Sequence, residues 1–182
     1  MKLLAFAASN SRTSINKRLV THATEVFQKD VAPQAEVEIL DLNDYEMPIY
    51  SADREAEGGI PAEARKIFAK IGEADAVLVS YAEHNGNYTA AWKNIFDWAS
   101  RIDAKVFQNK PMVAMSASPG ASGGASVLAT AKNSASFFGA DLKGSFSVGP
   151  FGQKFDTDAG HLIDPETVAT LKQSLKDLNA AI

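Results

Sequence analysis

Five short apolar-rich runs alternate along the chain with longer segments in which apolar residues recur every three or four positions. The runs are residues 3–8, 37–42, 76–81, 111–116 and 142–148. Nearly continuous apolar runs are typical of strands that helices cover on both faces. The longer segments predict helices over residues 15–31, 60–72, 89–101, about 125–138 and 165–182. Alternation of this kind predicts an α/β fold, a doubly wound five-stranded parallel sheet with helices on both faces.

Breaker residues set the expected ends of these elements. Pro33 ends the first helix, Pro61 starts the second at a tolerated first-turn position, and Gly139 stops the fourth. The segment 43–59 carries little periodicity and predicts a long loop. Loops of this length in compact domains are usually functional or mobile.

Composition narrows the possibilities further. The 182 residues, 46% of them hydrophobic, fit one domain spanning 1–182. No cysteine is present, which excludes disulfides, thiolate catalysis, cysteine zinc sites and iron–sulfur clusters. His22, His84 and His161 are too scattered to predict a metal site, and His22 lies off the apolar stripe of its helix, where we expect it to be solvated.

Charge and hydropathy bear on partners and location. The net charge of −4 gives no reason to expect a nucleic-acid partner. No run is long enough to span a bilayer, and the N-terminal apolar run is too short for a signal peptide. We therefore expect no membrane partner and a cytoplasmic location.

The first loop, residues 9–16, joins the first predicted strand to the first predicted helix and has the composition of a phosphate site. Helix N-termini present unpaired N–H groups to anions, and three serines and a threonine add hydroxyls. No Asp or Glu precedes Glu25, whereas four cations lie within the first 18 residues. The alternative is that Ser14 only caps the helix. The first glycine is Gly58, so neither a dinucleotide fingerprint nor a Walker loop fits.

Two further loops belong to the same expected site, because ligands of doubly wound sheets bind beyond the carboxyl ends of the strands. The third loop, residues 82–88, is polar and able to hydrogen-bond or stack. The fourth loop, residues 117–124, contains three glycines that let the backbone approach a flat ring closely. An ordinary glycine-rich turn is the alternative for the fourth loop. A phosphate with a planar heteroaromatic head describes FMN.

Several motifs resemble those of the NAD(P)H-dependent FMN reductase family. The first loop is similar to its opening motif and to the phosphate loop of flavodoxins, and residues 41–50 resemble its Asp-Leu…Pro-x-Tyr stretch. The most specific matches are Ala8-Ser9-x-x-x-x-Ser14-x-Asn16, Lys93-Asn94-Ile95-Phe96-Asp97-Trp98 and Ser116-Ala117-Ser118-Pro119-Gly120-x-x-Gly123-Gly124. The third loop departs from the family, with Ala82-Glu83-His84-Asn85 where Pro-Glu-Tyr-Asn is usual and Thr89 where Pro is common.

The resemblance implies a flavodoxin-like sheet of order 2-1-3-4-5 and an enzyme that uses FMN and NADH or NADPH. Electrons would pass to small-molecule acceptors such as quinones, free flavins or azo dyes, with flavin N5 carrying the chemistry and no catalytic protein group required. The implied cofactor-binding residues are Ser9, Ser11, Arg12, Ser14, Ile15 and Asn16 for the phosphate, Glu83, His84, Asn85 and Gly86 on one side of the ring, and Ser118, Gly120 and Gly123 on the other.

Two other functions remain open at this point. A flavodoxin-type electron carrier would bind the same cofactor, although such carriers are usually more acidic than this chain. A serine hydrolase would use Ser9 with Asp158 and His161, but the Gly-Asp-Ser opening of such enzymes is absent. The alternative for Asp158 and His161 is a surface turn.

The segment 89–101 bears on association. One face of this predicted helix carries Trp92, Ile95 and Phe96, and Trp98 lies on another side. A helix that is apolar on more than one side often contacts a second subunit, and with the family resemblance this predicts a homodimer or homotetramer. Packing within the core is the alternative.

Overall fold

The computed structural model describes all residues, 1–182, and is built around a parallel sheet. Its strands run in the order β2-β1-β3-β5-β6, and every neighbouring pair among these five is parallel. The bounds are β1 (Lys2–Ala8), β2 (Glu36–Leu40), β3 (Ala76–His84), β5 (Lys110–Ala117) and β6 (Ala140–Val148). With the short antiparallel strand β4 (Asn87–Tyr88) set aside, this is the predicted order 2-1-3-4-5, which is confirmed.

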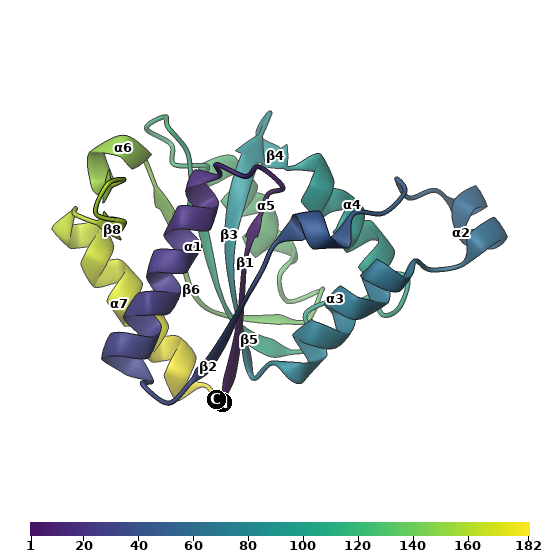
Figure 1. Cartoon of the computed structure of the whole chain (residues 1–182), viewed down its shortest axis with the longest axis horizontal. Helices are drawn as coiled ribbons and strands as arrows, with labels where there is room; N and C mark the ends of the chain where they lie inside the picture. The colour runs from purple at the N-terminus through teal and green to yellow at the C-terminus, as the bar shows by residue number, and fades with distance from the viewer.

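Helices cover both faces of the sheet, as Figure 1 shows. On one face lie α1 (Ile15–Val26), its π-helical continuation η1 (Phe27–Val31), and α7 (Pro165–Ala180). On the other face lie α3 (Ala62–Glu73), α4 (Ala90–Ala99) and α5 (Ala125–Ser134). The sheet therefore divides the apolar core into two layers, and the carboxyl ends of its strands stay free for loops.

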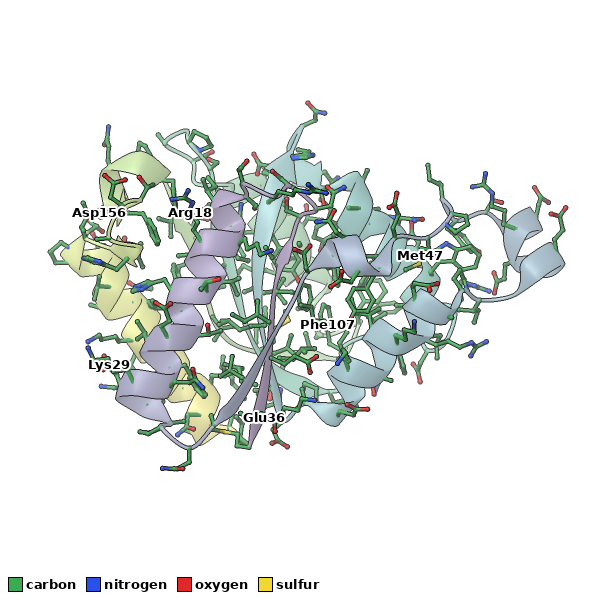
Figure 2. All side chains as sticks on the ribbon, in the orientation of Figure 1. Arg18, Lys29, Glu36, Met47, Phe107 and Asp156 are labelled. Atoms are coloured by element: carbon green, nitrogen blue, oxygen red, sulfur yellow. The ribbon has the colours of Figure 1, made fainter.

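Strand alternation fills the two layers. In β1, Leu4 and Phe6 point into the layer of α3, α4 and α5, while Leu3 and Ala5 point into that of α1 and α7. Trp92 is the largest side chain in the layer of α3, α4 and α5, and its ring centroid lies 5.0 Å from that of Phe6. Figure 2 shows how densely side chains fill the space around Phe107 in this layer. Burial of this aromatic group fixes α4 on the sheet.

The predicted loop 43–59 is wrong in part, because it contains two short helices. These are η2 (Leu42–Tyr45) and α2 (Ala52–Gly58), and α2 stands away from the body in Figure 1 with no buried residue. Ser51 caps α2 by accepting a hydrogen bond from the Arg54 N–H, and Arg101 pairs with Glu55. Local capping and one ion pair thus hold a helix that has no apolar periodicity to reveal it.

The expected subunit-contact role of Trp98 is also wrong, because the chain itself covers this side of α4. Trp98 is 1% exposed, and its Nε1–H donates to the Pro48 carbonyl at 2.7 Å. The Tyr50 ring packs against it edge to face at 5.0 Å. The second apolar side of α4 therefore packs within the chain, against residues 47–50.

The segment after β6 forms α6 (Phe151–Lys154) and a small hairpin of β7 (Phe155–Asp156) and β8 (His161–Leu162), which packs on α1. His22 lies half-buried in α1 with its ring edge against Phe155 at 5.9 Å, so the expected solvated His22 is wrong. None of the helices is both long enough and apolar enough to cross a bilayer.

Candidate cofactor site

The first, third and fourth loops meet at the carboxyl edge of the sheet, at the top of Figure 1, because β1, β3 and β5 are neighbouring parallel strands. The junction of α1 with the first loop is tied to the other two strands by one side chain, Asn16. Its Oδ1 accepts from the Ser80 hydroxyl at 2.8 Å and from the Ala117 N–H at 2.9 Å, and its Nδ2 donates to the Ala117 carbonyl at 3.0 Å. This buried side chain therefore holds the fold and is turned away from the phosphate position predicted for it.

The first loop keeps several backbone donors free. The N–H groups of Arg12, Thr13, Ile15 and Asn16 have no acceptor within the chain. Ser14 caps α1 by accepting from the Lys17 N–H at 3.4 Å. The loop therefore presents the positive end of a helix together with unsatisfied donors, an arrangement that fits an anion.

The hydroxyls of this loop differ in exposure. Ser9 and Ser14 are 7% and 8% exposed, whereas Ser11 is exposed. The Ser9 Oγ accepts from the Ser11 N–H at 3.2 Å and folds the loop back on itself. Both buried serines therefore shape the loop and still carry hydroxyl protons to donate.

The charges around the first loop leave Arg12 without a carboxylate partner. Lys17 pairs with Asp41 at 2.5 Å, and this hydrogen bond, helped by the Asn43 N–H, lowers the pKa of Asp41 to about 2. The Asn43 side chain donates to the Asn10 carbonyl at 3.1 Å and thus joins this pair to the first loop. Arg12 is exposed and has no carboxylate partner, so its charge is available to a bound anion.

The third loop is a β-hairpin where the sequence predicted a polar loop without regular structure. β3 continues to His84 and pairs with β4, and the turn is made by Asn85 and Gly86 at φ values of 52° and 76°. An Asn-Gly pair with both φ values positive forms the tight turn that fits twisted strands. His84, Asn85 and Gly86 are therefore exposed at the tip.

Glu83 connects the third loop to the helix after the fourth. Its Oε2 accepts from the Val127 N–H at 2.9 Å, in the first turn of α5. The N-cap of α5 is Gly124, which has no side chain to satisfy that turn. The carboxylate thus replaces the missing cap, and its negative charge is attracted to the positive end of the helix dipole. Sequence reasoning missed this role.

The fourth loop depends on close backbone approach. Gly123 has φ 61°, and a Cβ there would lie 2.7 Å from the Val148 carbonyl carbon and 2.8 Å from the Gly149 nitrogen. The Ser116 hydroxyl donates to the Gly123 carbonyl at 2.8 Å, and the Ser118 N–H donates to the Val148 carbonyl at 3.3 Å. Only glycine fits this position. Ser118 is half-buried and Gly120 exposed, so the two lie toward the free side of the loop.

Thr89 is a further residue that sequence reasoning missed. It is 1% exposed, its hydroxyl donates to the Ala8 carbonyl at 2.9 Å, and its Oγ1 accepts from the Trp92 N–H at 3.2 Å. One side chain therefore caps α4 and binds it to the end of β1. A threonine immediately before a helix is a recognisable cap signal, but its second partner, 81 residues away, is not.

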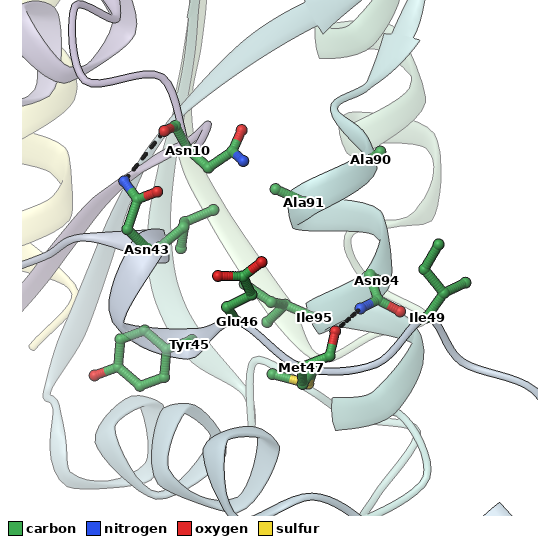
Figure 3. A pocket seen from close by; sticks show the side chains of 11 residues that line it. Asn10, Asn43, Tyr45, Glu46, Met47, Ile49, Ala90, Ala91, Asn94 and Ile95 are labelled. Atoms are coloured by element: carbon green, nitrogen blue, oxygen red, sulfur yellow. Dashed lines mark hydrogen bonds between the residues drawn. The ribbon is translucent and has the colours of Figure 1, made fainter. Parts of the chain in front are cut away.

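A cleft of about 300 Å³ adjoins the first loop (Figure 3). It lies between residues 42–49 and the start of α4, and Asn10 forms its edge toward the first loop. Leu42, Met47 and Ile95 provide apolar surface. The Asn94 side chain is occupied with the Met47 and Pro48 carbonyls and the Tyr50 N–H, so it shapes the cleft.

The serine hydrolase alternative has no geometric support. Asp158 and His161 belong to the exposed hairpin on α1, where the His161 ring lies 6.4 Å from that of His22. Ser9 has only the Ser11 N–H as a side-chain partner. Asp158 and His161 are therefore part of a surface turn.

The family model described as NADPH-dependent FMN reductase matches residues 1–153 of the chain. The chain belongs to this family. It is 31% identical over 186 residues to an NADPH:quinone oxidoreductase of Arabidopsis thaliana, covering 99% of this chain and 91% of that protein. It is 30% identical over 132 residues to a quinone reductase of Escherichia coli strain K12, covering 71% and 70%.

The fold has solved counterparts. A flavoenzyme NAD(P)H:(acceptor) oxidoreductase from Paracoccus denitrificans superposes with a TM-score of 0.74 at 23% identity, covering 98% of this chain and 95% of that one. The predicted fold, family and class of enzyme, an NAD(P)H-dependent flavin oxidoreductase, are thus confirmed.

Proposed function

We propose that this FMN reductase family member binds FMN in the space between its three loops and passes electrons from NADH or NADPH to quinones, free flavins or azo compounds. The observation that carries the proposal is the first loop, where unpaired N–H groups at the start of α1 lie next to the unpaired cation of Arg12. These groups fit a phosphate, and the glycine-built fourth loop fits a flat ring.

Each loop has its own task in this proposal. Ser9, Ser11 and Ser14 donate hydroxyl hydrogen bonds to the phosphate, Ile15 and Asn16 contribute their N–H groups, and Arg12 supplies a positive charge. His84, Asn85 and Gly86 flank one side of the ring and Ser118, Gly120 and Gly123 the other, while Glu83 acts through its cap on α5. Bound FMN supplies hydride chemistry at N5, so the chain has to bind, orient and exclude water.

The family assignment specifies neither the electron acceptor of this chain nor its oligomeric state, so both are part of the proposal. Quinones are the acceptors named for the relatives in Arabidopsis thaliana and Escherichia coli, and we assign them to this chain by analogy. We extend the proposal to a homodimer or homotetramer in the cytoplasm, formed through a surface other than the buried Trp98.

Titration with FMN tests the cofactor assignment. A ligand selective for the folded chain raises the melting temperature by mass action, and the flavin fluorescence changes on binding. We expect both effects with FMN and a smaller shift with riboflavin, which lacks the phosphate. Absence of both effects at saturating FMN would overturn the proposal.

An anaerobic experiment then distinguishes the enzyme from an electron carrier. NADH or NADPH alone should bleach the bound flavin, and a small quinone should restore the colour through repeated cycles. A carrier would accept electrons from a separate flavoprotein and from neither nicotinamide. That result would move the assignment to electron transfer.

A further inference from the structure

The cleft beside the first loop has an uneven distribution of polar groups. Figure 3 shows the Glu46 carboxylate and the Asn10 side chain directed into the same space between the first loop and α4. Neither side chain has a hydrogen-bond or ion-pair partner within the chain, whereas the amides of Asn43 and Asn94 are engaged. The cleft therefore offers a ligand one amide and one uncompensated carboxylate.

The surrounding charges do not neutralise this carboxylate. Lys17 is paired with Asp41, and Lys93 is paired with Asp97 at 2.7 Å. Asp44, in η2, is exposed and adds a second unpaired negative charge to the same segment. The electrostatic potential in the cleft is therefore negative, whereas the potential at the first loop, which borders the cleft, is positive.

The size and walls of the cleft fit a small aromatic compound. Its volume of about 300 Å³ is at the lower end of ligand pockets, and Leu42, Met47 and Ile95 line it with apolar surface. Ala90 and Ala91, at the start of α4, leave room beside the hairpin that holds the proposed ring site. A compound of two or three fused rings fits such a space, and a dinucleotide does not.

We propose that this cleft is the acceptor site and that Glu46 sets its specificity, admitting neutral or cationic ring compounds and rejecting anionic ones. The inference rests on the proposed function and names the acceptor class of that site. Asn10 donates a hydrogen bond to an acceptor oxygen such as a quinone carbonyl, while Glu46 repels a sulfonate or carboxylate held in the same space. Glu46 is thus a specificity residue and takes no part in electron transfer.

A matched pair of probes tests the charge argument. Both 2-(hydroxymethyl)anthraquinone and anthraquinone-2-sulfonate have the same ring system, and only the second is anionic. We expect the wild-type chain to bind the neutral probe at least about tenfold more tightly, which corresponds to ~1.4 kcal/mol. Equilibrium dialysis, run with and without FMN, measures both dissociation constants and requires no turnover.

Three variants locate the effect. E46Q should tighten binding of the sulfonate and reduce the ratio of the two dissociation constants at least about threefold, and it should lower KM for the sulfonate more than KM for the neutral probe. E57Q is the matched control, because Glu57 is an exposed, unpaired carboxylate of α2 outside this cleft. A91F should fill the cleft and weaken binding of both probes, while FMN still binds.

The outcomes separate this inference from the proposed function. Equal binding of both probes to the wild type, an unchanged ratio in E46Q, an equal change in E57Q, or undiminished binding in A91F would each overturn the acceptor site. Failure of the chain to bind FMN would overturn the proposed function instead. Because dialysis without FMN still reports on the cleft, the two failures are distinguishable.

Discussion

The first and fourth loops border the same proposed cofactor space, but different devices hold them in shape. The first loop contains no glycine and relies on side chains, with Ser14 capping α1 and the Ser9 Oγ folding the loop back. The fourth loop relies on backbone contact, with Gly123 pressed against the Val148 and Gly149 backbone. Substitutions in the first loop should therefore affect ligand affinity most, and substitutions in the fourth loop should affect stability most.

Asn16 is the exception that tests this contrast, since it lies in the first turn of α1 and yet bonds to the strand that carries the fourth loop. Asn16→Ala should show the largest effect on stability. It leaves the Ser80 hydroxyl and the Ala117 N–H and carbonyl unpaired in a buried site, at about 1–3 kcal/mol for each group. We expect the free energy of unfolding in urea to fall by about 4 kcal/mol.

The matched control is Asn10→Ala, at an exposed asparagine of the same loop whose side chain has no partner. Its change should stay within about 0.5 kcal/mol. Equal losses in the two variants would show that the Asn16 network does not stabilise the fold.

Gly123→Ala should have the next largest effect. The added Cβ meets backbone atoms at 2.7 Å and 2.8 Å that belong to another strand end, and φ is 61°. Overpacking and left-handed strain together should lower the free energy of unfolding by about 3 kcal/mol. Gly120→Ala is the control, because its nearest neighbour would be the Ser118 Oγ at 3.9 Å. If the two alanine variants are equally stable, the fourth loop is less tightly packed than described.

The serine pair of the first loop should give a smaller change in stability and a clear change in affinity. Replacing Ser9 and Ser14 by alanine removes two hydroxyl donors to the proposed phosphate. A hydrogen bond to a charged group contributes about 1.5–3 kcal/mol, so FMN should bind on the order of a hundredfold more weakly. Riboflavin binding, measured by fluorescence titration, should change much less. Equal losses for the two flavins would argue against a phosphate in this loop.

A decrease in pH should have the smallest effect on stability. The group responsible is His22, where the β7–β8 hairpin packs on α1. Burial, with a contribution from His161, lowers the pKa of His22 below its ordinary value of 6.5. The unfolded chain then binds more protons than the folded one, so stability is retained above about pH 6.5 and falls as the pH decreases through that value. Urea unfolding at pH 7.5 and 5.5 should show the decrease. His22→Phe, which keeps a ring against Phe155, should reduce it, and an unchanged slope would exclude His22 as the cause.

Much of the fold could be read from the sequence because the signal is local. Apolar runs gave the strands, four-residue periodicity gave α1 and α7, and the alternation of the two left few possible topologies. The composition of the loops is also a local signal. Ser9 to Ser14 and Gly120 to Gly124 identify a polar and a glycine-rich loop without reference to any other segment.

Only the tertiary structure decided what individual polar side chains do. Asn16 lies in the first loop by sequence, but its partner Ala117 is 101 residues away, and this contact turns the side chain into the fold. Glu83 bonds to α5 and Trp98 to Pro48 for the same reason. A side chain takes the buried partner that satisfies it, and that partner exists only after the sheet has brought distant strand ends together. Helix α2 and the cleft around Glu46 also depend on such contacts, so no period in the sequence predicts them.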